Sequence, residues 1–191
     1  PVAVYNIVAD FGQSRGTNTA TILPNETAHA RKYGRTILLR SNIMRNPELF
    51  DARLGIFQSV LARQHHDDLL LDGGFYRTLW HEIGHYLGVD RTADGRELDE
   101  ALEEASSILE ELKADLVSLF LVDALLESGY YDEKMARAHY ADGVRRVLLK
   151  NKPGRSQTYR VMQNMQFNYY IEKGLFQYHD KNNRLIVHYD K

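Results

Sequence analysis

Cysteine is absent from this chain of 191 residues. The absence excludes disulfides, thiolate metal ligands and a cysteine nucleophile, and it suits a reducing or an oxidising compartment. The formal net charge is −2, which provides no broad basic surface for nucleic acid or an anionic membrane. No apolar run approaches the roughly 20 residues that a membrane-spanning helix needs. We therefore expect a soluble globular protein without nucleic-acid or membrane partners.

An N-terminal methionine and a charged-then-apolar leader are also missing, because the sequence begins at Pro1. We interpret the chain as a fragment, a processed protein or a trimmed piece of a longer one. The lack of a leader favours a cytoplasmic location, although a leader removed before Pro1 is also compatible with the sequence. The length suits one domain, residues 1–191, with a substantial core.

The local patterns predict a mainly α fold with a few peripheral β-strands. Residues 1–45 form a strand-rich segment, residues 46–175 a helical core, and residues 176–191 a hairpin that turns at Asn182-Asn183. The expected strands are Val2–Ala9, Thr19–Leu23 and Thr36–Leu39. The expected helices are Pro47 to about His65 with Asn46 as N-cap, Phe75–Leu87 with Asp72 as a candidate N-cap, Leu98–Glu127, Asp132–Lys150 and Ser156–Lys173. Leucines in the third helix, including Leu109 and Leu116, predict a buried apolar stripe.

The second of these helices contains the metal-binding pattern His81-Glu82-Ile83-Gly84-His85. Four residues make about one helical turn, so both imidazoles leave the same face and can bind one ion. Glu82 lies one step round the helix, within reach of water at that ion. Neutral imidazole suits zinc. The alternative is a chance spacing of two histidines in the core or on the surface.

The next long helix supplies candidates for a third ligand in the run Glu110-Glu111-Leu112-Lys113-Ala114-Asp115. Zinc peptidases of the His-His-Glu kind take their third ligand from a glutamate on a later helix, and an acidic residue one turn further on often orients a ligating histidine. Glu111 and Asp115 have this spacing. A solvated acidic face is the alternative for these carboxylates.

Together, HEIGH and EELKAD resemble the motifs of the dipeptidyl peptidase III family of zinc metallopeptidases. The segments TILPNETAHARKYGRTILLR and MQFNYYIEKGLFQY resemble family segments as well. The resemblance implies one Zn²⁺ bound by His81, His85 and Glu111, with Glu82 as the catalytic acid and base. It also implies that Glu110 and Asp115 orient the two histidines. Asn25, in the Pro24-Asn25 pair, would hold the backbone of a peptide substrate.

Three positions depart from the family pattern. The metal motif has five residues where well-known members have six, and Ile22 replaces a family asparagine. Tyr159 stands where members have a histidine that stabilises the transition state, and we expect its hydroxyl to take over that role. The alternative is a tyrosine that only packs on an amphipathic helix. Members are also much longer, with a helical zinc-bearing lobe and a second lobe built around a β-barrel. The resemblance thus implies that this chain is the helical catalytic lobe, without most of the second lobe.

We therefore predict zinc-dependent hydrolysis of peptide bonds, in which Glu82 takes a proton from water and returns it to the leaving amine. The resemblance adds release of dipeptides from peptide N-termini. Two alternatives stay open: a thermolysin-type zinc endopeptidase, which uses the same three ligands, and a non-catalytic module that binds zinc or peptides. A metal-free helical interaction domain would require both motifs to be coincidental.

Overall fold

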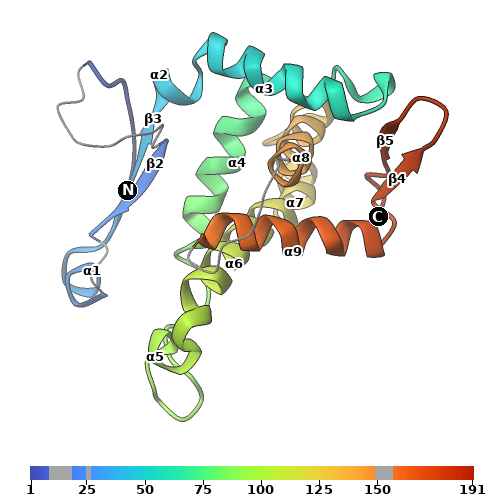
Figure 1. Cartoon of the computed structure of the whole chain (residues 1–191). Coiled ribbons are helices and arrows are strands. Elements are labelled where there is room, and N and C mark those ends of the chain that lie inside the picture. The colour runs from blue at the N-terminus through green and yellow to red at the C-terminus, as the bar shows by residue number, and fades with distance from the viewer. Residues whose placement is uncertain (9–18, 25–26, 149–156) are drawn as a thin grey trace.

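The computed structural model describes residues 1–8, 19–24, 27–148 and 157–191, and helices dominate them (Figure 1). This confirms the predicted fold class, mainly α with a few strands. α4, Leu71–Gly84, runs through the middle of the molecule and packs against α6, Ser106–Phe120, and α8, Glu133–Val147. α9, Thr158–Glu172, crosses α6 and α8. None of the described helices is both long and apolar enough to cross a membrane.

Two small sheets flank the helices, as the sequence predicts. In the first, β3 (Thr36–Arg40) pairs in parallel with β1 (Val2–Tyr5) and antiparallel with β2 (Ala20–Leu23), and α1 (Thr27–Tyr33) connects β2 to β3. β2 is therefore an edge strand among the described residues. The second sheet is the predicted hairpin of β4 (Phe176–His179) and β5 (Arg184–Val187), whose turn places Asn183 at a φ of 52°. Asparagine tolerates this left-handed conformation.

α3, Pro47–Val60, begins where the sequence predicts and ends earlier. Asn46 caps it by accepting the Leu49 N–H at 2.9 Å. The helix stops before His65 because Leu61 adopts an extended conformation and forms a bridge to Leu185 in the hairpin. A core cluster forms at this junction. Its buried members are Phe57, Leu61, Leu69, Ala141, Val144, Val147, Phe176 and Val187.

The prediction that Asp72 caps the metal helix is wrong. α4 begins at Leu71, so Asp72 lies inside the first turn, where its carboxylate accepts a hydrogen bond from Arg45 at 2.6 Å. An acid in the first turn still complements the helix dipole. A short helix, α2 (Ser41–Met44), leads to Arg45, and this ion pair therefore ties the start of α4 to the chain after β3.

The predicted long helix Leu98–Glu127 is broken into shorter pieces. α5 covers Leu98–Leu102, a 3₁₀ turn covers Glu103–Ala105, and α6 is followed by α7, Val122–Glu127. Glu103 adopts a φ of 50°, which a continuous helix does not allow.

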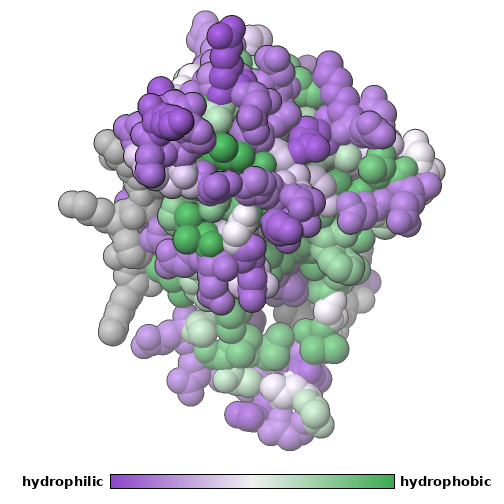
Figure 2. Space-filling view, turned by 90° about the vertical axis from the view of Figure 1, so that its right-hand side faces the viewer, coloured by the Kyte–Doolittle hydropathy of each residue, from purple (hydrophilic) through white to green (hydrophobic). Residues whose placement is uncertain are grey.

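The predicted apolar stripe on this segment is also wrong. Leu109 and Leu116 are 37% and 44% exposed, whereas Ala114, Asp115 and Ser118 are buried. In Figure 2, apolar side chains gather in the lower half of the face, at the height that α5 and α6 occupy in Figure 1. α6 therefore turns its polar face inward, because α4 offers polar partners at close range.

Gly84 allows α4 and α6 to approach this closely. A Cβ atom at Gly84 would lie 2.9 Å from the Cα and carbonyl oxygen of Ala114, a distance that real Cβ atoms do not reach. Near the start of α4, a Cβ at Gly73 would lie 2.5 Å from the carbonyl oxygen of Ala138. α4 is thus packed closely against α8 near its start and against α6 at its end.

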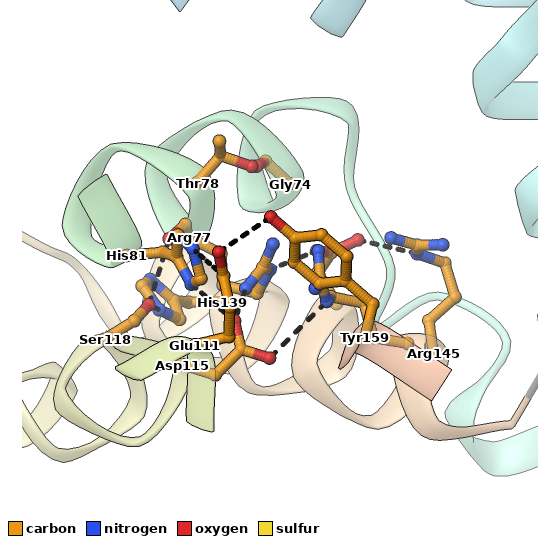
Figure 3. A network of polar contacts seen from close by, with 12 residues as sticks. Gly74, Arg77, Thr78, His81, Glu111, Asp115, Ser118, His139, Arg145 and Tyr159 are labelled. Atoms are coloured by element: carbon orange, nitrogen blue, oxygen red, sulfur yellow. Dashed lines mark hydrogen bonds and ion pairs between the residues drawn. The ribbon is translucent and has the colours of Figure 1, made fainter. Parts of the chain in front are cut away.

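A buried arginine joins these three helices (Figure 3). Arg77 on α4 donates to Asp115 on α6 at 2.7 Å and to Asp142 on α8 at 2.8 Å. Arg145 also donates to Asp142, at 2.7 Å. Burial opposes both carboxylates, yet the surrounding arginines hold the pKa values of Asp115 and Asp142 well below their usual range. The cluster is therefore charged at neutral pH.

A second buried chain of hydrogen bonds runs from Trp80 through Tyr131 and His139 to Ser118. The Trp80 indole donates to the Tyr131 hydroxyl at 3.0 Å, and the Ser118 hydroxyl donates to the Arg77 carbonyl at 3.0 Å. His139 lies between them, 3.2 Å from Tyr131 through Nδ1 and 2.9 Å from Ser118 through Nε2. Every group has a partner when His139 is neutral, with its proton on Nε2.

Replacing His139 by Gln should make the unfolding free energy depend less on pH below neutrality. Burial, and then the charge of Arg77, lower the pKa of His139 to about 3. In the unfolded chain, the imidazole of His139 binds a proton below about pH 6.5, whereas in the folded chain it stays neutral down to about pH 3. The unfolding free energy therefore falls as the pH falls through this window. Between pH 7 and pH 5 the wild type should lose about 2 kcal/mol more than His139→Gln. Urea unfolding in the presence of a chelator measures this difference, and parallel curves would contradict it.

Candidate metal centre

His81 and His85 lie at the C-terminal end of α4. His81 is buried on the last turn, and His85 follows Gly84 with a helical φ and ψ of −66° and −19°. The helical path therefore continues through His85, and both imidazoles leave the same face, as the spacing predicts. Their ring centroids lie 4.8 Å apart with the rings perpendicular.

Carboxylates on α6 hold the outer nitrogen of each imidazole. Asp115 lies 2.7 Å from Nδ1 of His81, and Glu110 lies 2.8 Å from Nδ1 of His85. Lys113 donates to Glu110 at 2.9 Å and to the carbonyl of Leu87 at 2.8 Å. Burial disfavours the charged form of Glu110, but His85 and Lys113 outweigh it and lower its pKa. An anion at Nδ1 favours the neutral tautomer that carries its proton on Nδ1 and its lone pair on Nε2.

The two Nε2 atoms and one carboxylate oxygen converge on a single point. His81 Nε2 lies 3.2 Å from His85 Nε2 and 3.1 Å from Glu111 Oε2, and the third side, from His85 Nε2 to Glu111 Oε2, is 3.8 Å. Ligand atoms about 2.0–2.1 Å from a tetrahedral zinc lie roughly 3.3 Å apart. Two imidazole lone pairs and a carboxylate at these separations repel one another unless a cation lies between them. The residues therefore fit zinc.

Glu111 supports this fit through its own hydrogen bonding. Its Oε2 is buried and accepts no hydrogen bond within the described part of the chain. Its Oε1 accepts the hydroxyl proton of Tyr159 at 3.0 Å (Figure 3). Burial opposes its charge, but His81 in particular holds the pKa of Glu111 below its usual value. An ionised carboxylate with one buried oxygen that accepts no hydrogen bond is suited to bind a metal ion.

Glu82 faces an open groove of about 770 Å³ beside this cluster. The groove is bordered by the edge strand β2, by the segment after α4 and by α6. Its lining includes Ala20, Thr21, Ile22, Gly34, Arg35, Glu82, His85, Tyr86, Glu110, Glu111 and Tyr159. Burial raises the pKa of Glu82, while His81 and His85 act in the opposite direction. A carboxylate of raised pKa beside a candidate metal is suited to accept and return a proton.

The structure brings together His81, Glu82, His85, Glu110, Glu111, Asp115 and Tyr159, from α4, α6 and α9. Asn25 lies outside the described residues. Arg77, Lys113 and Arg35 contribute to the site and its groove, although sequence reasoning did not select them. Arg77 could have been found from its spacing, because it lies one turn before His81. Lys113 lies inside the acidic motif, while nothing in the sequence singles out Arg35.

Comparisons with known proteins identify the fold. The solved structures that match include DPP III from Caldithrix abyssi, with a TM-score of 0.77 and 24% identity over 90% of this chain. They also include dipeptidyl-peptidase III from Corallococcus sp. strain EGB, with a TM-score of 0.84 and 22% identity over all of this chain. The chain spans 33% and 36% of those chains. The predicted resemblance to dipeptidyl peptidase III is thus confirmed as a shared fold.

Comparisons with a curated relative and with family models assign no function to this chain. Nudix hydrolase 3 of Arabidopsis thaliana is 24% identical over 185 residues, which cover 94% of this chain and 24% of the plant protein. About three quarters of that protein lie outside the match, so its name assigns no activity to this chain. No family model matches.

Replacing Glu111 by Ala should remove tight zinc binding. We expect about one zinc per wild-type chain, and the loss in the variant should exceed the about 10–100-fold that removal of an outer hydrogen-bond partner typically costs. Equilibrium dialysis against a competing chelator measures the affinity. Glu104→Ala, at an exposed position between α5 and α6, is the matched control. Full zinc occupancy in Glu111→Ala would show that the third ligand is another residue.

Proposed function

We propose that this chain is the zinc-binding part of a metallopeptidase that releases dipeptides from peptide N-termini. The observation that carries the proposal is the convergence of His81, His85 and Glu111, with Glu111 Oε2 buried and unsatisfied. Glu82 adds the means for hydrolysis, because a purely structural zinc site needs no free carboxylate beside it. The shared fold with two dipeptidyl-peptidase III structures supports the peptidase assignment.

Zinc, when bound by these three residues, would polarise the scissile carbonyl and activate a water. The chain itself supplies the proton transfer and the support of the ligands. Glu82 takes a proton from the attacking water and delivers it to the amine of the departing peptide. Asp115 and Glu110 keep both imidazoles in the tautomer that presents Nε2. Arg77, held by Asp142, fixes Asp115 in turn.

The edge strand β2 offers a means of holding a peptide in the groove. Ala20, Thr21 and Ile22 line the groove, and β2 pairs with β3 on its other side. An extended peptide can add to such an edge through main-chain hydrogen bonds, which read backbone rather than side chains. The peptide would then pass Glu82 and the metal cluster. We propose that Asn25, two residues after β2, also holds substrate backbone.

The dipeptide specificity rests on the likeness to structures of dipeptidyl-peptidases. Because the chain spans about a third of those structures, we propose that it acts within a longer parent protein whose second lobe completes the cleft. A thermolysin-type endopeptidase would use the same ligands and cut internal bonds. A non-catalytic module would bind zinc or peptides without cleaving peptide bonds.

Replacing Glu82 by Gln should separate metal binding from hydrolysis. Glu82 is no part of the converging ligand set, so the variant of the parent protein should keep its fold and about one zinc. Loss of the general base should lower turnover by about 10²–10⁴-fold. Mass spectrometry of the products from an unblocked peptide measures the rate and shows whether dipeptides appear. Undiminished turnover would refute the role of Glu82, and internal cuts by the wild type would favour the endopeptidase.

Tyr159 is the group best placed to stabilise negative charge on the reacting carbonyl. Its hydroxyl reaches Glu111 at 3.0 Å, so it lies beside the metal cluster rather than pointing away (Figure 3). Partial burial, together with the charge of Glu111, raises the pKa of Tyr159. The phenol therefore keeps its proton near neutral pH and stays a donor. We propose that it donates to the carbonyl oxygen as charge develops there.

Replacing Tyr159 by Phe removes this hydroxyl and little else. Loss of one oxyanion donor should lower kcat of the parent protein by about 10²–10³-fold and leave zinc content unchanged. Tyr169→Phe, on the exposed part of the same helix, is the matched control. Steady-state kinetics and zinc analysis on the same samples provide both readouts. A fall in zinc affinity that accounts for the lost activity would instead show that Tyr159 only holds Glu111 in place.

A further inference from the structure

Arg35 stands out among the charged residues that line the groove. Its Nε is buried and has no hydrogen-bond partner, and no ion pair to its guanidinium forms within the described part of the chain. Its guanidinium carbon lies 6.0 Å from the centroid of the Tyr86 ring, which orients it without neutralising it. Arg35 immediately precedes β3, so it approaches the groove from the sheet, across from the metal helix.

The neighbouring charges of the groove are satisfied internally. Glu97 pairs with Arg91, Asp99 accepts from Ser106, and Lys113 pairs with Glu110. Asp90, which also lines the groove, has a partner as well. Glu110 and Glu111 hold the two histidines and the Tyr159 hydroxyl, as described above. Glu82 and Arg35 remain as charged lining residues without a hydrogen bond or ion pair to another described residue. Glu82 has a use in proton transfer, whereas Arg35 has none in the proposed chemistry.

An unpaired, partly buried guanidinium is costly to leave unsatisfied. Its planar fork matches a carboxylate in a two-point contact, which is both stronger and more directional than a contact to a neutral group. The other charged residues of the lining are mostly acids, which repel a carboxylate on a bound peptide. Such a carboxylate is therefore tolerated only beside a cation. Arg35 provides that cation at one fixed place beside β2.

We propose that Arg35 is a specificity site that binds a carboxylate of the peptide lying along β2. The proposal rests on the proposed peptide-binding role of the groove. The carboxylate is either an acidic side chain at one fixed position of the peptide or the C-terminus of a short peptide. These two sources share their chemistry and can be separated experimentally. Arg35 contributes to recognition of the peptide and takes no part in the cleavage of its bonds.

The test is a binding measurement with the zinc-loaded parent protein carrying Glu82→Gln, which slows turnover. A labelled neutral peptide is scanned with Glu, and separately with Gln, at each position, and each is compared as free acid and as C-terminal amide. Fluorescence anisotropy gives Kd. We expect one Glu position, or the free C-terminus, to bind about tenfold more tightly than its neutral counterpart. Arg35→Gln should abolish this preference and leave the Kd of the neutral peptide unchanged.

Two further variants keep the result interpretable. Arg63→Gln makes the same charge change at an exposed residue outside the groove and should retain the preference. Arg35→Lys keeps the charge without the two-point geometry and should retain part of it. A carboxylate preference that survives in Arg35→Gln, or peptide binding without any such preference, would overturn the proposal while leaving the peptidase assignment intact. If no peptide binds the zinc-loaded parent protein, the peptide-binding role of the groove itself fails, and this proposal fails with it.

Discussion

Asp115 accepts hydrogen bonds from Arg77 and from His81 in the space where α4, α6 and α8 meet. The carboxylate is buried, and Arg146 approaches it to 3.6 Å from the side of α8. Burying such charges costs several kcal/mol per ion, and the cost is recovered only when every partner is present. The packing of the three helices and the orientation of one candidate metal ligand therefore depend on the same interaction. A change at Asp115 would disturb both the fold and the site.

The remaining geometry of the site follows from this contact and from helical periodicity. Arg77 and His81 lie one turn apart on α4, so both reach Asp115. Glu111 and Asp115 lie one turn apart on α6, so fixing Asp115 directs Glu111 toward the same imidazoles. The contact between Gly84 and Ala114 sets the separation of the two helices at this level. A methyl group at position 84 would push α6 away from α4, because α8 leaves α4 no room to move. The distances between the candidate metal ligands on the two helices would then increase.

The parts of the site that lie within one helix could be predicted, and those between distant segments could not. The spacing from His81 to His85 and from Glu111 to Asp115 is local, so the helical repeat alone places each pair. Tyr159 and Arg35 reach the site through tertiary packing, which no local pattern encodes, and only the family resemblance pointed to Tyr159. The expected stripe through Leu109 and Leu116 failed because α6 buries its hydrogen-bonding face. The break at Glu103 depends on a single φ of 50° without a glycine to signal it.

The most direct test of the metal centre is anomalous X-ray diffraction from zinc-loaded crystals, recorded on both sides of the zinc absorption edge. We predict one strong anomalous peak, located between Nε2 of His81, Nε2 of His85 and Oε2 of Glu111, with Glu82 beside it and outside the coordination sphere. A principal peak elsewhere in the chain would contradict the assignment. So would a peak at this position whose protein ligands include Glu82 or exclude Glu111.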